Sequence, residues 1–234
     1  MRHAMQHRGR KDNKIKAKHR RSVPMIIAID GPAASGKGTI AKLVAAHYGL
    51  AHLDTGSLYR AVARDTLAIG GDPADPSAAL ASARGLDPST LDDPELRAPG
   101  VGEAASIVAK HPQVRDELLA YQRSFARAKS GAVLDGRDIG TVICPDADVK
   151  LFVTATAGER ARRRYFELRQ AGVAISEADV VVDIRRRDER DENRAAAPLR
   201  RAADAYLLDT TNLAIDAAFK AAIDLIDAAM DRAG

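Results

Sequence analysis

The residues best suited to chemistry stand in a glycine-rich loop between a short apolar run and a helical pattern. Residues 25–29 are all apolar, which predicts a strand buried on both faces, and helical spacing of apolar residues begins at Ile40. The small residues between them leave backbone N–H groups free to surround an anion, and the following helix adds the positive end of its dipole. A lysine in the loop brings a point charge for terminal phosphates. We therefore predict a nucleoside-triphosphate site, formed by Gly31, Pro32, Ala33, Ala34, Ser35, Gly36, Lys37, Gly38 and Thr39.

The end of this loop departs from the general phosphate-loop pattern. Gly38 stands where Ser or Thr is expected after the lysine, and Thr39 comes one place later. This Gly-Lys-Gly-Thr ending resembles nucleoside monophosphate kinases rather than GTPases. The alternative is a strand–helix turn that binds no ligand, which the flanking strand and helix patterns disfavour.

Acidic residues follow the predicted strands. Short apolar runs at 51–54, 132–134, 149–153 and 206–208 alternate with helical patterns, which predicts an α/β fold with a five-stranded parallel sheet flanked by helices in three layers. Ligands of such sheets bind beyond the carboxyl ends of the strands, and there the sequence has Asp30, Asp54, Asp135 and Asp209. We expect Asp135 to hold Mg²⁺ through water, although a polar turn with no metal is the alternative.

Two arginine clusters lie on predicted helices. In the helix at about 177–194, Arg187, Asp191 and Arg194 share one face, whereas Arg186, Arg190 and Arg194 repeat like charges every four residues. Such repetition costs stability unless an anion lies nearby, so we favour a phosphate-binding face over a solvated face with an Arg187–Asp191 ion pair. The helix at about 157–170 carries the second cluster and is expected to close as a lid that excludes water, the alternative being a basic surface helix. Its arginines are Arg160, Arg162, Arg163 and Arg164.

Residues 70–99 differ from the rest of the chain. They contain five of the ten prolines and no Val, Ile, Phe or Tyr, so we expect no sheet there and a short helix near 77–83. Helical patterns return at about 102–110 and from Pro112 onward.

Charge and composition indicate how the chain is organised and where it functions. Residues 1–22 carry a net charge of +8 in a chain of net +4, so the other 212 residues carry −4. We interpret 1–22 as a basic disordered leader or an artefact of an upstream start, and 23–234 as a single kinase domain of the phosphate-loop class. Cys144, the single cysteine, predicts a reducing cytoplasm and a core position. The chain shows no membrane-spanning apolar stretch, and we expect a monomer.

Five segments in their order along the chain carry a resemblance to a known family. IDGPAASGKGT, LDTGSLYR, LDGRDIGTVICPDADVKLFV, ERARRR and RRDERDENRAAAPL are similar to segments of the bacterial cytidylate kinase family, and the likeness covers about residues 25–230. The resemblance implies a P-loop NTPase fold that transfers a phosphoryl group from ATP to CMP or dCMP with Mg²⁺. Family members often carry a small antiparallel sheet in the acceptor-binding region, here about 56–130. Residues 70–99 predict a reduced insert without it, with the lid at about 157–194.

The resemblance also implies roles for individual residues. The loop from Gly31 to Thr39 would bind the phosphates of ATP, with Lys37 as a catalytic cation. Arg163 and Arg164 would be lid arginines that reach the donor, and Arg137 and Arg194 would act beside the transferring phosphoryl group. The acceptor would be held by its phosphate, base and sugar through Thr55, Tyr59, Arg60, Ser106, Arg115, Arg137, Asp138, Arg187, Asp191 and Arg194.

Two other functions stay open. Another small phosphoryl acceptor (AMP, UMP or shikimate) would use the same loop and arginines. A nucleotide-dependent RNA-binding protein that uses the basic residues 1–22 is the alternative outside enzymes, and the negative charge of the remaining chain disfavours nucleic acid as a partner.

Overall fold

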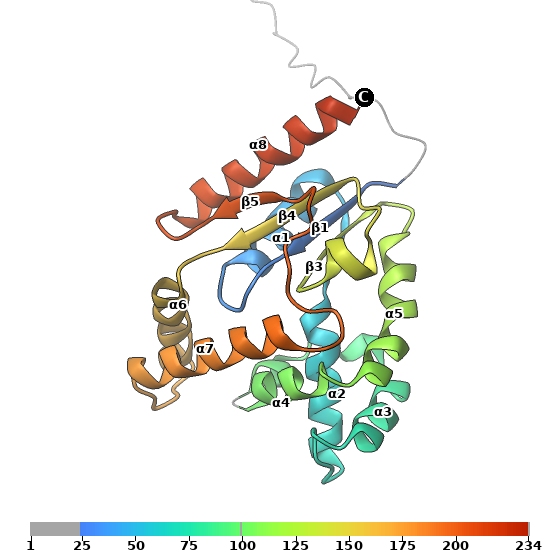
Figure 1. The fold of residues 1–234 in the computed structure, drawn as a ribbon, viewed down its shortest axis with the longest axis vertical. Helices are drawn as coiled ribbons and strands as arrows, with labels where there is room; N and C mark the ends of the chain where they lie inside the picture. Colours follow the sequence, from blue (N-terminus) through green and yellow to red (C-terminus); the bar gives the residue numbers. More distant parts are fainter. Residues whose placement is uncertain (1–23, 99, 234) are drawn as a thin grey trace, which may run out of the picture.

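The computed structural model describes residues 24–98 and 100–233, in which five parallel strands form one sheet of order β2-β3-β1-β4-β5 (Figure 1). The strands are β1 (Ile26–Asp30), β2 (Ala51–Asp54), β3 (Ala132–Gly136), β4 (Val149–Thr154) and β5 (Tyr206–Asp209). All five lie where the apolar runs predict them, within two residues at each end. The interpretation of residues 1–22 as a leader lies outside the described residues.

Helices cover both faces of the sheet, because successive residues of its strands point to opposite sides. Ile27 and Ile29 of β1 pack against α1 (Lys37–Tyr48) and α8 (Ile215–Ala233), whereas Ala28 faces the cluster built with α2 (Thr55–Ala68) and α5 (Pro112–Ala126). All three β1 residues are fully buried. This explains why the strand reads as a continuous apolar run, and it confirms the three-layer α/β prediction.

The described residues between β2 and β3 form helices joined by turns, with no strand. It contains α2, α3 (Pro76–Arg84), the short 3₁₀ helices η1 (Pro88–Thr90) and η2 (Pro94–Arg97), α4 (Val101–Val108) and α5. Aspartates begin four of these elements, since Asp54, Asp75, Asp87 and Asp93 each accept a hydrogen bond from the backbone two residues later. Residues 70–98 form no strand, as their composition predicts.

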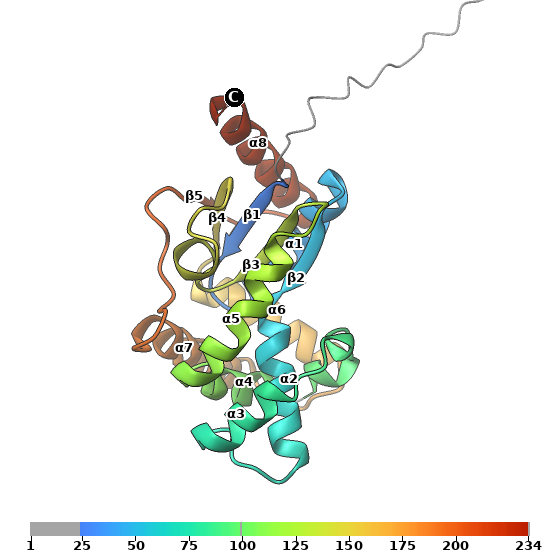
Figure 2. The same cartoon turned by 90° about the vertical axis from the view of Figure 1, so that its right-hand side faces the viewer.

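Two helices after β4 form a second group. α6 (Ala157–Gln170) and α7 (Glu177–Asn193) pack on each other, and α7 also contacts α4. Figure 1 shows this pair at the lower left and α2, α3 and α4 at the lower right, both below the sheet. The rotated view in Figure 2 places α2 to α5 together beneath the strands.

The carboxyl ends of the strands lie in register between these two groups. Asp30 pairs with Gly136, Asp54 with Asp135, and Thr154 with Asp209, so the acids that end the strands share one edge. Asp30 is buried and accepts hydrogen bonds from the N–H groups of Ile139 and Gly140, both at 2.8 Å. It thereby fixes the π-helical turn η3 (Ile139–Ile143), which the sequence did not predict. Cys144, next to this turn, is a buried core residue as expected.

None of the helices in residues 24–98 and 100–233 has both the length and the apolar composition that crossing a bilayer requires.

Candidate active site

The glycine-rich loop connects β1 to α1 in a conformation that only small residues allow. Gly31 has φ 155° and a Cβ there would lie 2.0 Å from the carbonyl oxygen of Val153, so the loop passes directly over the end of β4. Gly36 begins α1 in the left-handed region, with φ 85°. No acidic residue stands in the first turn of α1, which leaves the positive end of the helix available to an anion.

A cavity of about 200 Å³ opens beside this loop, and we call it the inner cavity. It is bounded by α2, α4, α5, the end of β3 and α7, which are far apart in the sequence. All ten residues that the sequence predicts for acceptor binding line it, together with Lys37 and Asp135. The ten are Thr55, Tyr59, Arg60, Ser106, Arg115, Arg137, Asp138, Arg187, Asp191 and Arg194.

Buried ion pairs fix part of this lining. Asp138 accepts hydrogen bonds from the guanidinium groups of Arg115 on α5 and Arg194 beyond α7, and Asp138 is 4% exposed. Arg137 Nε donates to Asp191 Oδ2 at 2.8 Å, which joins the end of β3 to α7. Burial opposes the ionisation of Asp191, but the positive charges of Arg137 and Arg187 outweigh it and lower the pKa of this carboxyl group.

The cavity also holds buried donors with no partner among the described residues. They include Arg187 Nε, Arg60 Nε and Ser106 Oγ. Burial lowers the pKa of Arg187 to about 10, and the nearby charge of Arg137 acts in the same direction. The same two causes lower the pKa of Lys37 to about 7. Unpartnered donors and destabilised cations together describe a site that favours anions.

Asp135 lies on the floor of the inner cavity, with 2% of its surface exposed. His52 Nε2 lies 2.9 Å from Asp135 Oδ1, a neighbour that the sequence did not suggest because β2 and β3 are distant along the chain. The described residues contain no cluster of three or more His, Cys, Asp or Glu that would hold a metal alone. A single carboxylate beside a phosphate site nevertheless suits Mg²⁺, which takes one or two carboxylates and completes its shell with phosphates and water.

A second cavity, which we call the outer cavity, also adjoins the loop and is lined by the predicted lid arginines Arg163 and Arg164. Ser35, Gly36, Gly38 and Thr39 line it together with Arg163 and Arg164 of α6. Arg163 donates to the carbonyl and hydroxyl oxygens of Thr210 at 2.6 and 3.0 Å, so its guanidinium is anchored to the protein. Arg164 pairs with Glu167 at 2.8 Å. Pro32 and Gly31 support the loop from below, where both are buried.

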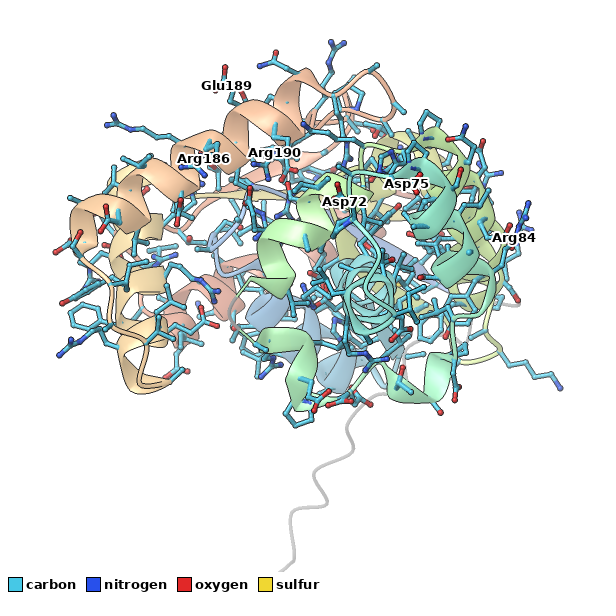
Figure 3. All side chains as sticks on the ribbon, turned by 90° about the horizontal axis from the view of Figure 1, so that it is seen from below. Asp72, Asp75, Arg84, Arg186, Glu189 and Arg190 are labelled. Carbon is cyan, nitrogen blue, oxygen red and sulfur yellow. The ribbon has the colours of Figure 1, made fainter. Side chains whose placement is uncertain are left out.

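Protein carboxylates lie beside all three arginines that repeat every four residues, Arg194 included through Asp138, so the repetition of like charge is not evidence for a bound anion. Arg190 donates to Glu103 of α4, and Arg186 lies 3.5 Å from Asp183 at the surface, so protein carboxylates already balance both. Figure 3 shows Arg190 on the side of α7 that faces α4 and Glu189 on the outer side. The alternative Arg187–Asp191 pair is also absent from the described hydrogen bonds, since Asp191 pairs with Arg137. Contacts with other elements, which spacing along α7 does not encode, decide the partners of Arg190 and Asp191.

Comparisons with known proteins agree with this geometry. A family model described as cytidylate kinase matches residues 27–228. Proteins named cytidylate kinase from Rhodopseudomonas palustris (strain TIE-1) and Bradyrhizobium sp. (strain ORS 278) are both 59% identical over 204 residues, which cover 87% of this chain and 96% of each relative. The one from Nitrobacter winogradskyi (strain Nb-255) is 58% identical over 210 residues, 90% of this chain and 99% of the relative. A crystal structure of an uncharacterized protein from Eubacterium ventriosum ATCC 27560 is similar in fold, with a TM-score of 0.52 and 16% identity over 87% of this chain and 98% of that chain.

Proposed function

The chain belongs to the cytidylate kinase family, and we propose that it transfers the terminal phosphoryl group of ATP to CMP and dCMP, giving CDP and dCDP. The supporting observation is that one cavity beside the phosphate loop is lined by Lys37 and by all ten residues predicted for the acceptor. A donor phosphate on the loop and an acceptor phosphate in the inner cavity would therefore meet at Lys37.

The donor binds by its phosphates to the backbone N–H groups of residues 31–39 and to the positive end of α1. Lys37 neutralises the terminal phosphates, and their negative charge returns its pKa toward the ordinary lysine value. Arg163 and Arg164 border the outer cavity on α6 and exclude water from the donor when the lid closes.

The acceptor binds by three parts of its structure. Arg60 and Arg137 hold its phosphate, and Arg194 neutralises charge next to it. Ser106, Arg115 and Asp138 read the base, because cytosine offers an amino donor and ring acceptors that match a carboxylate and a guanidinium. Arg187 and Asp191 contact the sugar, and Thr55 and Tyr59 complete the wall of the cavity.

The reaction needs alignment and charge neutralisation rather than a general base. A phosphate monoester has a second pKa of about 6, so the attacking oxygen of the acceptor is already deprotonated at neutral pH. Lys37, Arg137 and Arg194 then bring two mutually repelling phosphates into line and stabilise the charge that spreads over the transferred group. Mg²⁺, held by Asp135 through water, supplies the additional neutralisation of the donor phosphates.

The experiment that tests this function is an acceptor panel with the purified full chain. CMP, dCMP, AMP, UMP and shikimate are supplied separately with Mg²⁺ and ATP, and ADP formation is measured at several acceptor concentrations. We expect CMP and dCMP to have the highest kcat/KM. Equal values for CMP and AMP, or rapid turnover of shikimate with none of CMP, would show that the acceptor assignment is wrong.

A further inference from the structure

Arg160 of α6 is buried at 5% exposure, and hydrogen bonds from its guanidinium group reach three separate parts of the protein. Nε donates to the carbonyl oxygen of Ala155 after β4, at 2.9 Å. Nη1 donates to the carbonyl oxygen of Ala33 in the phosphate loop, at 3.3 Å. Nη1 and Nη2 also form a bidentate pair with the carboxylate of Asp188 on α7, at 2.9 and 2.7 Å. Four of its five N–H groups donate inside the protein, which leaves the buried side chain of Arg160 little capacity to bind a phosphate.

The bond to Ala33 decides which way a loop peptide points. In a trans peptide the C=O and the following N–H point in opposite directions, and no cis peptide occurs in the described residues. When the Ala33 carbonyl is turned toward Arg160, the N–H of Ala34 is turned away from α6. Ala34 lines both the inner and the outer cavity, and its N–H has no acceptor among the described hydrogen bonds, so this N–H is available to an anion.

Ala34 also needs an external restraint. Its φ of 58° lies in the left-handed region, which is costly for a residue with a Cβ and persists only where the surroundings impose it. The next carbonyl but one, that of Ser35, is held in the same manner, because Thr210 Oγ1 donates to it at 2.9 Å. The loop carbonyls are thus held by side chains from outside the loop.

The pair with Asp188 connects this restraint to the acceptor side. Asp188 directly follows Arg187 on α7 and stands three residues before Asp191, and both of those neighbours line the inner cavity. Val180 and Ile184 of α7 pack with Ala33 and Ala161 in one apolar cluster beneath the ion pair. The buried side chain of Arg160 therefore links α7 to the phosphate loop.

We propose that Arg160 is a positioning residue for donor binding: it holds the Ala33–Ala34 peptide of the phosphate loop with its N–H toward the donor phosphates. This inference rests on the proposed function to the extent that the loop binds the phosphates of ATP. It assigns Arg160 no contact with either nucleotide.

The test measures donor and acceptor binding separately in variants of the full chain. Arg160→Met removes the bond to Ala33, and Arg160→Lys retains one donor. Asp188→Asn removes the charge of the ion pair while leaving the bond to Ala33 intact. Because a lone buried Asp188 would destabilise Arg160→Met, the double variant Arg160→Met/Asp188→Leu replaces the pair with apolar groups. Arg169→Met/Glu189→Leu, which changes exposed residues of the same two helices, is the matched control.

We expect Arg160→Met and the double variant to bind ADP about tenfold more weakly by calorimetry, with CMP affinity changed less than threefold. Arg160→Lys recovers part of the loss, and Asp188→Asn and the control stay within threefold of wild type. In ¹⁵N NMR spectra the Ala34 amide resonance shifts in the Arg160 variants before any ligand is added. These measurements distinguish an effect on the loop from a general loss of folding, because a loss of folding would lower the affinity for ADP and for CMP together.

Two results would overturn the inference. One is a folded double variant that binds ADP as wild type does; the other is an Asp188→Asn variant as impaired in ADP binding as Arg160→Met. This test is independent of the test of the proposed function, because ADP binding can be measured without any acceptor. A wild-type protein that binds ADP but leaves CMP unchanged would refute the acceptor assignment and leave the role of Arg160 to be decided by its own variants.

Discussion

Replacing Asp138 by Asn removes one negative charge from between two buried guanidinium groups and keeps the shape of the side chain. Asp138 accepts from Arg115 and Arg194, and a hydrogen bond to a charged group contributes about 1.5–3 kcal/mol. If recognition of cytosine depends on these hydrogen bonds, kcat/KM for CMP falls roughly 10- to 150-fold, at about 1.4 kcal/mol per factor of ten. The asparagine amide also presents a donor, which suits uracil, so the preference for CMP over UMP falls as well.

Initial rates measured against CMP, UMP and ATP separately test this reasoning for Asp138. We expect the KM for ATP to change less than threefold, because the phosphate loop lies outside the Arg115–Asp138–Arg194 group. Glu117→Gln on the exposed side of α5, which removes only a 3.6 Å surface pair with Arg84, is the control and leaves all three substrates unaffected. Equal losses for ATP and CMP, or an unchanged CMP/UMP ratio, would refute the base-reading role of Asp138.

Three further perturbations probe the phosphate loop and its support. Gly31→Ala places a Cβ 2.0 Å from the Val153 carbonyl and lowers the melting temperature more than Gly49→Ala, whose Cβ meets no atom within 4 Å; similar losses would exclude the clash. Burial raises the pKa of Asp30 to about 7, above its unfolded value, so wild type loses stability as pH rises toward and through 7; Asp30→Asn loses one of the two accepted hydrogen bonds, but its melting temperature relative to wild type rises as pH increases from 5 to 8, and a pH-independent difference would contradict this. Lys37→Met lowers kcat at least about 100-fold by removing a transition-state charge, with CMP binding retained in calorimetry; loss of CMP binding instead would place Lys37 on the acceptor.

The fold was predictable from sequence where local pattern and burial agree. The apolar runs of β1, β3 and β4 are buried on both faces, so each stands out between polar turns, and α6 begins at the predicted residue because Thr156 caps its first turn. The π-helical turn after β3 was not predictable in the same way. Its shape depends on two hydrogen bonds to Asp30, more than a hundred residues earlier in the chain.

The residues of the site were predictable from the sequence, but their hydrogen-bond and ion-pair partners were not. Motif resemblance identified residues that line the inner cavity, whereas the partners of Asp191 and Arg190 and the Thr210 contact of Arg163 come from other elements and had no signal in the spacing along α6 or α7. The proximity of His52 to Asp135 likewise depends on the pairing of β2 with β3. Residue types indicate what a site can bind, whereas the order of the strands determines which residues lie close together.

The inner cavity contains several groups that cost free energy in the unliganded protein. Lys37 and Arg187 are cations whose pKa values burial lowers, and Ser106 Oγ and Arg187 Nε are buried without a partner among the described residues. Each of these groups costs free energy in the unliganded protein, and a phosphate or a base that satisfies it recovers that free energy on binding. Binding of the two nucleotides should therefore stabilise the fold as well as align the reaction, because the same donors and charges serve both. The buried Arg160–Asp188 pair, by contrast, is satisfied within the protein. This is expected of a residue that positions the loop, whereas residues that bind substrate have hydrogen-bonding groups left unpaired until the substrate is bound.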